Sequence, residues 1–224
     1  DGLRRLSPDI PVLSEESPRE VIAQRHGWDR LWLVDPLDGT REFLDRSGEF
    51  TVNLALVEGG VPRLGILYLP LEQIAYLGIP GDNGWRCQQL NGCWVRRELA
   101  PRRFFPDGGI TVLASRRHRN ARLEKTLSLL ASRVGSIERL DSGSALKFAR
   151  LADGGGDCYP RFSPCSEWDV AAGQAILESV GGAVLGLDGQ PLRYNARGTL
   201  LSPHFLAVAD RSPRLWGELL MTLA

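Results

Sequence analysis

Apolar and polar residues alternate through much of the first half of the chain. Residues 51–60, 63–70 and 73–80 form short alternating segments separated by Gly, Pro or Asn, and further turn sequences follow at 81–84 and 91–92. Short alternating segments joined by such turns are typical of an antiparallel sheet with one buried face. We therefore predict that the first half is built on an antiparallel sheet of short strands.

Strand and helix patterns alternate in the second half. The expected strands cover residues 110–114, 136–140, 157–160 and 205–209, with a hairpin over 183–194, and the expected helices cover 120–134, 143–152, 170–180 and 212–224. Such alternation predicts an α/β arrangement. Because the connecting segment 96–109 is basic, irregular and contains Pro, we place the boundary there, between an antiparallel-sheet half, 1–108, and an α/β half, 109–224.

One short apolar segment, Leu31 to Val34, ends directly in two acidic residues, Asp35 and Asp38. Ionised carboxylates at the edge of a core are costly unless they are paired or bound to a cation. The following Gly39 and Thr40 can present backbone N–H groups to a phosphate oxygen. An Asp-capped turn at a strand end is the simpler alternative, but the whole pattern favours a site for a divalent cation and a phosphate.

Charge and cysteine content exclude other classes of protein. The 27 basic and 27 acidic side chains cancel, which argues against binding a nucleic acid polymer through a general basic field. No apolar run approaches the ~20 residues that span a bilayer. The chain has four cysteines without a C-x-x-C pair and three dispersed histidines, so a zinc site is not expected. We expect the cysteines to be free thiols in a reducing cytoplasm, and a Cys158–Cys165 disulfide is the alternative.

Two further carboxylates complete a candidate metal site. Glu15 follows a short extended run at 10–13, and Asp169 precedes the helix expected at 170–180. Alone, Glu15 would be read as part of a solvated turn and Asp169 as an ordinary helix N-cap. Together with Asp35 and Asp38 they would give three or four carboxylates around one pocket. Oxygen ligands suit Mg²⁺, and two such ions about 4 Å apart can activate a water and stabilise the leaving oxygen of a phosphate ester.

The motifs W-x-V-D-P-L-D-G-T-x-E-F at 32–43, W-D-x-A-A-G at 168–173 and S-E-E at 14–16 resemble the signatures of the inositol monophosphatase superfamily, the lithium-sensitive, magnesium-dependent phosphatases. Four further segments are most similar to those of the bacterial 3′(2′),5′-bisphosphate nucleotidases of this superfamily: P-V-L-S-E-E, G-E-F-T-V-N, G-S-x-L-K-F and Y-P-R-F. The resemblance covers nearly the whole chain. It implies a layered α/β/α/β/α sandwich, two or three Mg²⁺ ions between the halves, and in-line attack by water without a phospho-enzyme.

The resemblance also implies roles for individual residues. The expected metal ligands are Glu15, Asp35, Asp38, Asp169 and the backbone carbonyl of Leu37. Thr40 would orient the attacking water. The expected catalytic residues are Thr40, Asp38 and Glu15. Gly39 and Thr40 would hold the phosphate that is cleaved, next to the metal ligands.

A bisphosphate substrate has a second phosphate that must be held without being cleaved. Lys147 and Arg161 are cations in otherwise apolar or small surroundings, and both residue types bind phosphate. Ser115, His118 and Ser144 could add hydrogen-bond donors. The alternative for Lys147 and Arg161 is a surface charge or a structural ion pair.

We therefore expect a Mg²⁺-dependent phosphatase that converts adenosine 3′,5′-bisphosphate to AMP, a reaction that would clear a by-product of sulfate assimilation, with 3′-phosphoadenylyl sulfate as a further candidate substrate. An inositol or fructose phosphatase of the same superfamily is the alternative, and a non-catalytic metal- or phosphate-binding module is the alternative of another class. We expect a cytoplasmic monomer or homodimer; the resemblance also allows peripheral association with the inner membrane.

The beginning of the chain departs from the family pattern. It starts at Asp1 without Met, inside what reads as a helix end, so we expect preceding residues to be missing. The related proteins carry a helical pair there, with a threonine and aspartate motif that helps to activate the water. If that region were truly absent, weak catalysis would be expected, and an N-terminally extended form would turn over faster.

Overall fold

The computed structural model describes residues 2–100, 102–105, 108–116 and 120–223, which form two sheets. The first sheet contains seven strands in chain order: β1 (Val12–Ser14), β2 (Arg30–Asp38), β3 (Thr51–Glu58), β4 (Val61–Leu69), β5 (Ile74–Gly78), β6 (Gly84–Leu90) and β7 (Cys93–Glu98). The β1 strand is parallel to β2, and every later pair is antiparallel. The antiparallel sheet predicted from the alternating segments is thus present.

The second sheet contains five strands in the order β11 (Ala183–Gly186), β12 (Phe205–Val208), β10 (Cys158–Arg161), β8 (Ile110–Ser115) and β9 (Ile137–Ser142). The central β8 is parallel to β9 and β10, whereas β12 is antiparallel to β10 and β11. Because consecutive parallel strands need a crossover, helices separate them along the chain.

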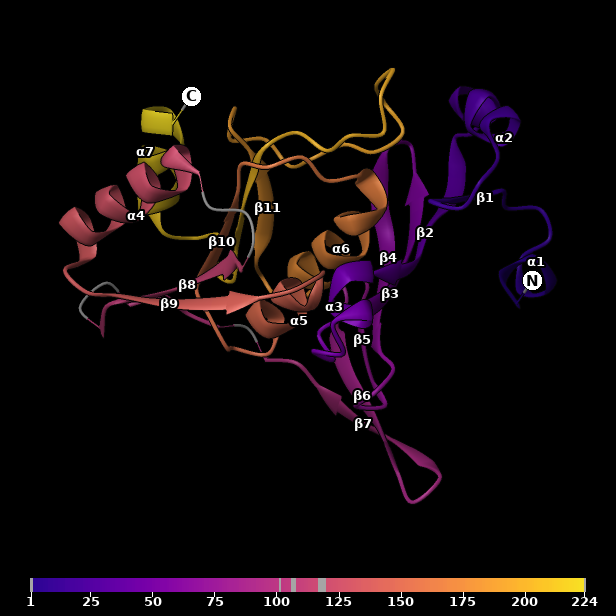
Figure 1. Ribbon diagram of the computed structural model, residues 1–224, viewed down its shortest axis with the longest axis horizontal. Coiled ribbons are helices and arrows are strands. Elements are labelled where there is room, and N and C mark those ends of the chain that lie inside the picture. Colours follow the sequence, from indigo (N-terminus) through magenta and orange to yellow (C-terminus); the bar gives the residue numbers. More distant parts are fainter. Residues whose placement is uncertain (1, 101, 106–107, 117–119, 224) are drawn as a thin grey trace.

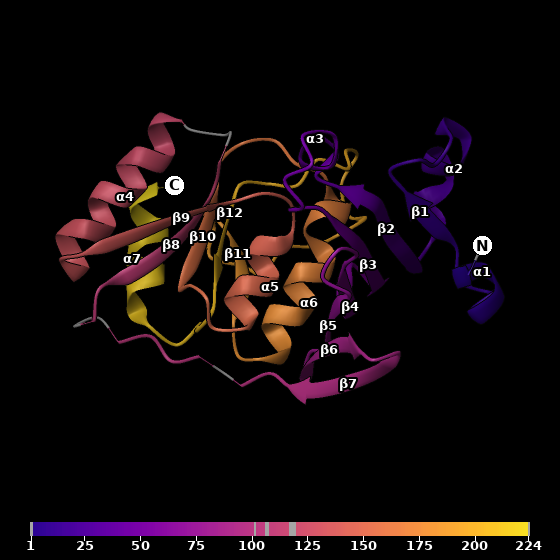
Figure 2. The same ribbon diagram turned by 60° about the horizontal axis from the view of Figure 1, so that its bottom comes forward.

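Two pairs of helices complete the layers (Figures 1 and 2). The helices α5 (Leu146–Ala152) and α6 (Ala171–Ser179) lie between the two sheets, and α4 (Ala121–Val134) and α7 (Arg214–Leu223) cover the far face of the second sheet. Three short helices, α1 (Gly2–Leu6), α2 (Arg19–Gln24) and α3 (Thr40–Leu44), flank the first sheet. The described residues thus form sheet, helix, sheet and helix layers, and the predicted layered α/β class is confirmed.

The change from one sheet to the other falls between Glu98 and Ile110. A single hydrophobic core nevertheless takes buried side chains from both sheets, such as Leu67 of β4 and Phe205 of β12, and packs them around α5 and α6. A second core lies between the second sheet and the outer helices α4 and α7. The two halves of the chain therefore share the helix layer between them.

The α6 helix lies unusually close to the first sheet because glycines face it. A β-carbon on Gly65 would collide with the carbonyl group of Ala172, and one on Gly78 would collide with the Cα atom of Ile176. On the other side of the helix, a β-carbon on Gly173 would collide with the ring of Phe148 in α5. Glycine is required at 65 and 78 for the close approach of backbone to backbone, and at 173 to leave room for the Phe148 ring.

The hairpin predicted at 183–194 forms over fewer residues than expected. Across the turn at 187–189, the Gly186 N–H donates to the Gln190 carbonyl at 2.8 Å and the Leu192 N–H donates to the Val184 carbonyl at 3.3 Å, on either side of an antiparallel bridge between Leu185 and Pro191. The second arm ends early because Tyr194 is buried in the core, where its N–H donates to the Gly60 carbonyl at 3.0 Å and its hydroxyl donates to Gln174 Oε1 at 2.6 Å. The four cysteines are free thiols, so the disulfide left open does not form. Among the described residues, no helix has the length and apolar character needed to cross a membrane.

Candidate metal and phosphate site

A β-bulge brings Asp35 and Asp38 to the same side of β2. Residues three apart point to opposite faces of a regular strand. The pairing of β2 with β3 is regular as far as Asp35, which lies opposite Asn53, and then shifts so that Asp38 lies opposite Thr51. One extra residue in β2 restores both carboxylates to one face, as bulges next to functional sites commonly do.

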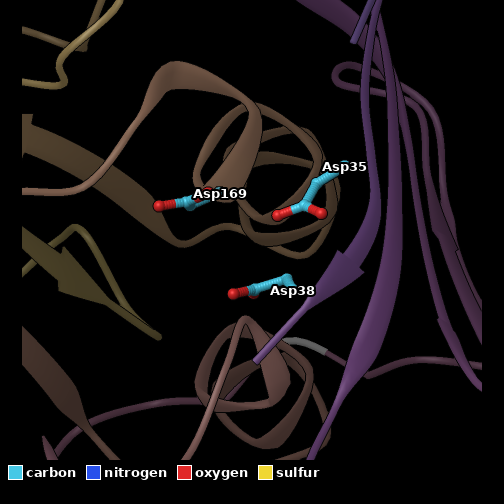
Figure 3. Close-up of side chains that lie close together, drawn as sticks. All are labelled: Asp35, Asp38 and Asp169. Atoms are coloured by element: carbon cyan, nitrogen blue, oxygen red, sulfur yellow. The ribbon is translucent and has the colours of Figure 1, made fainter. Parts of the chain in front are cut away.

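The third carboxylate comes from the other half of the chain. Asp169 ends a single 3₁₀ turn, η3 (Glu167–Asp169), that precedes α6. Each of Asp35, Asp38 and Asp169 offers an oxygen within 4.8 Å of those of the other two. Figure 3 shows the three side chains directed into one space between β2 and the start of α6.

Asp169 does not cap α6 as its position in the sequence suggested. Its Oδ2 atom accepts the backbone N–H of Ser166 at 2.9 Å, which closes a reciprocal capping box around the 3₁₀ turn, and the N-cap of α6 is Val170. The alternative reading of Asp169 as the N-cap of this helix is wrong because a separate turn intervenes. Asp169 is therefore held at the turn, with an oxygen within 4.8 Å of oxygens of Asp35 and Asp38.

Hydrogen bonds from neighbouring groups orient the two carboxylates of β2. Asp35 Oδ1 accepts the backbone N–H of Leu37 at 2.9 Å. Asp38 Oδ2 accepts the backbone N–H of Ala145 at 2.5 Å and the side-chain amide of Asn53 at 3.3 Å. Each carboxylate keeps oxygen lone pairs for another partner, since an ionised carboxylate has about four acceptor sites.

The three carboxyl groups disfavour one another's charge. Burial raises the pKa of Asp35 to about 8, and repulsion from Asp38, Asp169 and Glu15 adds to it. Burial and the charge of Asp38 raise the pKa of Asp169 to about 7, and burial also raises the pKa of Asp38, against the attraction of Lys147. A divalent cation would relieve the repulsion, and carboxylate oxygens are its preferred ligands. The triad therefore fits a divalent metal ion.

A cavity of about 340 Å³ opens beside the triad and is lined by both halves of the chain. Asp38, Gly39, Thr40 and Asp169 line it, as do Ser115, Ser144, Lys147 and Arg161 from the second half. The fold thus brings two of the expected metal ligands, Asp38 and Asp169, to the same cavity as Lys147 and Arg161. His118 lies outside the described residues.

Glu15 and Leu37 lie next to this site but not in the triad. The Glu15 side chain is exposed after β1, and its N–H donates to the Val34 carbonyl at 3.1 Å beside the DPLDGT segment. Its charge acts on Asp35 and Asp169. The Leu37 carbonyl accepts the Thr40 hydroxyl at 3.3 Å. Their roles as metal ligands stay predictions.

Lys147 is buried, with only 2% of its surface exposed. Its ammonium group donates to the carbonyls of Ser142 at 3.1 Å and Ser144 at 2.6 Å, and it lies 5.0 Å from the centre of the Tyr159 ring. Burial lowers its pKa to about 8, partly offset by the charge of Asp38. Two of three N–H donors are used on carbonyls, so one remains for a ligand.

Arg161 is held in the same way. Its guanidinium donates to the carbonyls of Ser163 at 3.2 Å and Pro164 at 2.9 Å and to the Tyr159 hydroxyl at 3.4 Å. These contacts fix a planar cation at the wall of the cavity. The alternative that Lys147 and Arg161 are simple surface charges is therefore wrong.

The G-E-F-T-V-N segment, for which no role was predicted, lies at the site. Asn53 and Thr51 are fully buried polar residues that contact Asp38, at 3.3 Å and 3.5 Å. Glu49 accepts the N–H of Gly143 at 2.9 Å and pairs with Arg116 at 3.0 Å. Polar residues at the inward positions of an apolar strand were the signal that could have revealed this supporting shell.

The chain belongs to the inositol monophosphatase family, whose model matches residues 1–219. It is 43% identical to 3′(2′),5′-bisphosphate nucleotidase CysQ of Escherichia coli K12 over 205 residues, which cover 92% of this chain and 78% of that protein. It is 32% identical to CysQ of Haemophilus influenzae over 212 residues, covering 95% and 76%. The resemblance seen in the motifs is confirmed.

Solved structures of the family have the same fold. CysQ from Bacteroides thetaiotaomicron matches with a TM-score of 0.80 and 38% identity, covering 93% of this chain and 80% of that chain. An inositol monophosphatase from Thermotoga maritima matches with a TM-score of 0.73 at 22% identity, covering 100% and 77%. The second likeness, at that identity, is one of fold.

Proposed function

We propose that this chain is a Mg²⁺-dependent phosphatase that hydrolyses adenosine 3′,5′-bisphosphate to AMP and phosphate, and accepts 3′-phosphoadenylyl sulfate as a second substrate. The observation that carries the proposal is one cavity lined by members of a carboxylate triad and by two immobilised cations, Lys147 and Arg161. The 43% identity to proteins named 3′(2′),5′-bisphosphate nucleotidase supports it. The four free thiols fit the reducing cytoplasm.

The metal ligands would be Asp35, Asp38 and Asp169, with Glu15 and the Leu37 carbonyl at the same site. Together they would hold two or three Mg²⁺ ions. Ions bound there lower the pKa of a water and offset the charge on the leaving oxygen of a phosphate ester. The chain contributes the orientation of the carboxylates through the N–H groups of Leu37, Ala145 and Ser166.

Thr40 would orient the attacking water. It begins α3, is exposed to the cavity and donates its hydroxyl proton to the Leu37 carbonyl at 3.3 Å. Because that proton is already directed away, the Thr40 oxygen keeps lone pairs that can accept a proton of a water molecule. The carboxylates of Asp38 and Glu15 would hold the other proton as the water attacks phosphorus.

Gly39 allows the phosphate-binding turn to approach the second half of the chain. It has φ = 90° and ψ = 44°, the left-handed conformation that favours glycine. A β-carbon there would lie 3.2 Å from the Glu49 carbonyl oxygen and from the β-carbon of Ser144. The N–H groups of Gly39 and Thr40 can then donate to the phosphate that is cleaved.

The second phosphate would bind between Lys147 and Arg161, with Ser115 and Ser144 as further donors. A charged donor makes the stronger hydrogen bonds to phosphate, and Arg can make two in parallel. A single phosphate ester would leave these cations without a ligand. This difference gives the site its preference for a bisphosphate.

Phosphate release tests the proposal, with adenosine 3′,5′-bisphosphate and inositol 1-phosphate compared in Mg²⁺, in chelator and with added Li⁺. Fast release from the nucleotide that chelator abolishes and Li⁺ inhibits is expected. Preference for the inositol ester would overturn the assignment of Lys147 and Arg161 while keeping the metal-dependent phosphatase. Release from neither ester would contradict the proposed enzyme as a whole.

A further inference from the structure

A loop over residues 194–202, here called the strap, runs beside the segment that leads into Asp169. The N–H of Ser202 donates to the Cys165 carbonyl at 2.8 Å, and the N–H of Glu167 donates to the Leu200 carbonyl at 2.8 Å. Between them, Ser166 and Leu201 form an antiparallel bridge. The strap is therefore attached to the residues immediately before Asp169.

Glu167 fastens the strap with a charge that is completely buried. Its side chain is 0% exposed. Oε2 accepts the backbone N–H of Asn195 at 2.6 Å, and Oε1 pairs with the Arg197 guanidinium at 3.0 Å. Both carboxylate oxygens are thus bound to the strap, two residues away from Asp169.

A second buried charge, Arg25, connects the strap to the first half of the chain. Arg25 is 2% exposed and donates to Asn195 Oδ1 at 2.9 Å and to the Arg197 carbonyl at 2.7 Å. The Asn195 amide donates in return to the carbonyls of Arg25 at 2.8 Å and Trp28 at 3.2 Å. Arg25 belongs to the connection between β1 and β2, which also carries Glu15.

The turn that carries Asp169 needs such support. A single 3₁₀ turn has poor hydrogen-bond geometry and little stability of its own. A metal site, however, requires its ligands to be held within about 0.5 Å by surrounding residues. Buried ion pairs seldom add much stability compared with apolar residues, so a buried charged cluster beside the carboxylate triad points to a specific arrangement. Asn195 also has φ = 53°, a conformation uncommon for residues other than glycine.

We propose that Arg25, Glu167, Asn195 and Arg197 form a clasp that positions the Asp169 carboxylate against Asp35 and Asp38, and so sets the affinity of the site for a divalent cation. The inference deepens the proposed function and rests on its metal site. Glu167 and its partners act through Asp169 and are positioning residues. The clasp also joins the segment that carries Glu15 to the turn that carries Asp169.

The test measures Mn²⁺ binding to the protein by the loss of the free Mn²⁺ resonance in electron paramagnetic resonance, without substrate. Glu167→Gln keeps an acceptor for Asn195 but leaves Arg197 without its counter-charge. We expect Mn²⁺ affinity to fall about 10- to 100-fold, as for other outer partners of metal ligands. Thermal unfolding of each variant is recorded in parallel.

The matched control is Asp157→Asn in the second sheet. Asp157 is 4% exposed, pairs with Arg102 at 2.8 Å and accepts the Thr111 N–H at 2.8 Å, so it is a similarly buried carboxylate held by an arginine and a backbone N–H. We expect it to lower the melting temperature without changing Mn²⁺ affinity. Equal losses of affinity in both variants, or unchanged affinity in Glu167→Gln, would overturn the clasp.

Two further variants keep the test decisive. Asn195→Gly retains the backbone N–H and the positive φ but removes the link to Arg25, so it should fold and bind Mn²⁺ more weakly than the unaltered chain; unchanged affinity would overturn the proposal. Glu167→Gln with Arg197→Gln removes both charges and should recover part of the affinity lost in the single variant.

An unaltered chain that binds Mn²⁺ but releases no phosphate would contradict the proposed function alone, whereas one that binds no Mn²⁺ would overturn the clasp as well.

Discussion

The carboxylate of Asp38 accepts a 2.5 Å hydrogen bond from the backbone N–H of Ala145, a residue 107 positions further along the chain. Asp38 ends β2 of the first sheet, and Ala145 lies in the turn before α5. The same oxygen also accepts a 3.3 Å hydrogen bond from the side-chain amide of Asn53, which lies in β3. One metal-ligand candidate is thus oriented by both halves of the molecule at once.

Replacing Asn53 by Leu should weaken metal binding. The change removes the amide that donates to Asp38 and to the Trp168 carbonyl, and it leaves the buried Thr51 hydroxyl without its 2.8 Å acceptor. We expect about 10- to 100-fold lower Mn²⁺ affinity and a loss of about 1–3 kcal/mol in the free energy of unfolding. Thr126→Val, at a buried hydroxyl in α4, is the control and should lower stability only. Unaltered affinity in Asn53→Leu would show that Asp38 needs no such support.

Replacing Asp35 by Asn should stabilise the metal-free protein and abolish the effect of metal. Burial and neighbouring carboxylates raise the pKa of Asp35 to about 8, so at any pH above the unfolded value of 3.8 folding must either protonate this carboxylate or bury its charge. A neutral amide should add about 0.5–2 kcal/mol to the free energy of unfolding without metal. The unaltered chain should gain stability when Mg²⁺ is added, by ligand linkage, and the variant should not.

Calorimetric melting with and without Mg²⁺ checks this, with Asp188→Asn at an exposed turn as the control. The control should melt like the unaltered chain in both conditions. A metal-free Asp35→Asn protein that melts lower than the unaltered chain would contradict the predicted repulsion.

Metal affinity should rise with pH through the neutral range. The pKa values of about 7 for Asp169 and about 8 for Asp35 mean that these groups hold protons at neutral pH, which a cation must displace. Mn²⁺ affinity should therefore increase up to about pH 8 and then level off. Isothermal titration in buffers of different ionisation enthalpy should detect proton release on binding, and its absence at neutral pH would contradict the raised pKa values.

The same pKa shifts predict how stability depends on pH. A carboxyl group whose pKa is raised on folding binds more protons in the folded than in the unfolded chain, so its contribution to stability is present below the unfolded value of 3.8 and is lost as pH rises to about 8. The metal-free protein should thus lose stability from this source between these limits. Saturating Mg²⁺ should reduce that loss, which melting curves across the range would measure.

Lys147→Ala should affect bisphosphates far more than monophosphates. Loss of a charge-assisted hydrogen bond to the second phosphate corresponds to about 10-fold or more in kcat/KM. Any general damage from the lost bonds to the Ser142 and Ser144 carbonyls should affect both substrates alike, so the ratio of the two kcat/KM values isolates the substrate contact. Lys125, the only other lysine, is exposed on α4, and Lys125→Ala should leave both rates unchanged. Equal loss on both substrates in Lys147→Ala would favour an inositol-type phosphatase.

Local patterns predicted much of the fold. Alternation between turns located β3, β4 and β5, and helical spacing located α4, because in these segments the local pattern and the tertiary packing agree. The turn signal at Asp188 and Gly189 correctly located a hairpin, but its second arm is shorter than predicted because Tyr194 pairs with Gly60 instead of with β11. Local sequence does not show which strand of a sheet will be the partner.

The site was predictable only in part. Asp35 and Asp38 could be singled out from a strand that ends in carboxylates, and Asp169 at a helix start could be grouped with them as a further candidate, but the position of Asp169 relative to β2 depends on the tertiary fold. The clasp was missed because Arg25 and Asn195 are 170 residues apart and each, taken alone, reads as an ordinary polar residue in a loop. Such contacts depend on the tertiary fold and leave no short-range pattern.

Two glycines of the first sheet, on which α6 packs, determine how far Asp169 lies from the carboxylates of β2. Because Gly65 and Gly78 let the helix rest on bare backbone, the depth of α6 over the first sheet is fixed by atoms that have no rotamers. A helix held by side chains could be raised or lowered by compensating substitutions in the core, and its first turn would follow. Here the distance between Asp169 and the β2 carboxylates is set by two strand positions that lack side chains, one against Ala172 in the first turn of α6 and one against Ile176 a turn later.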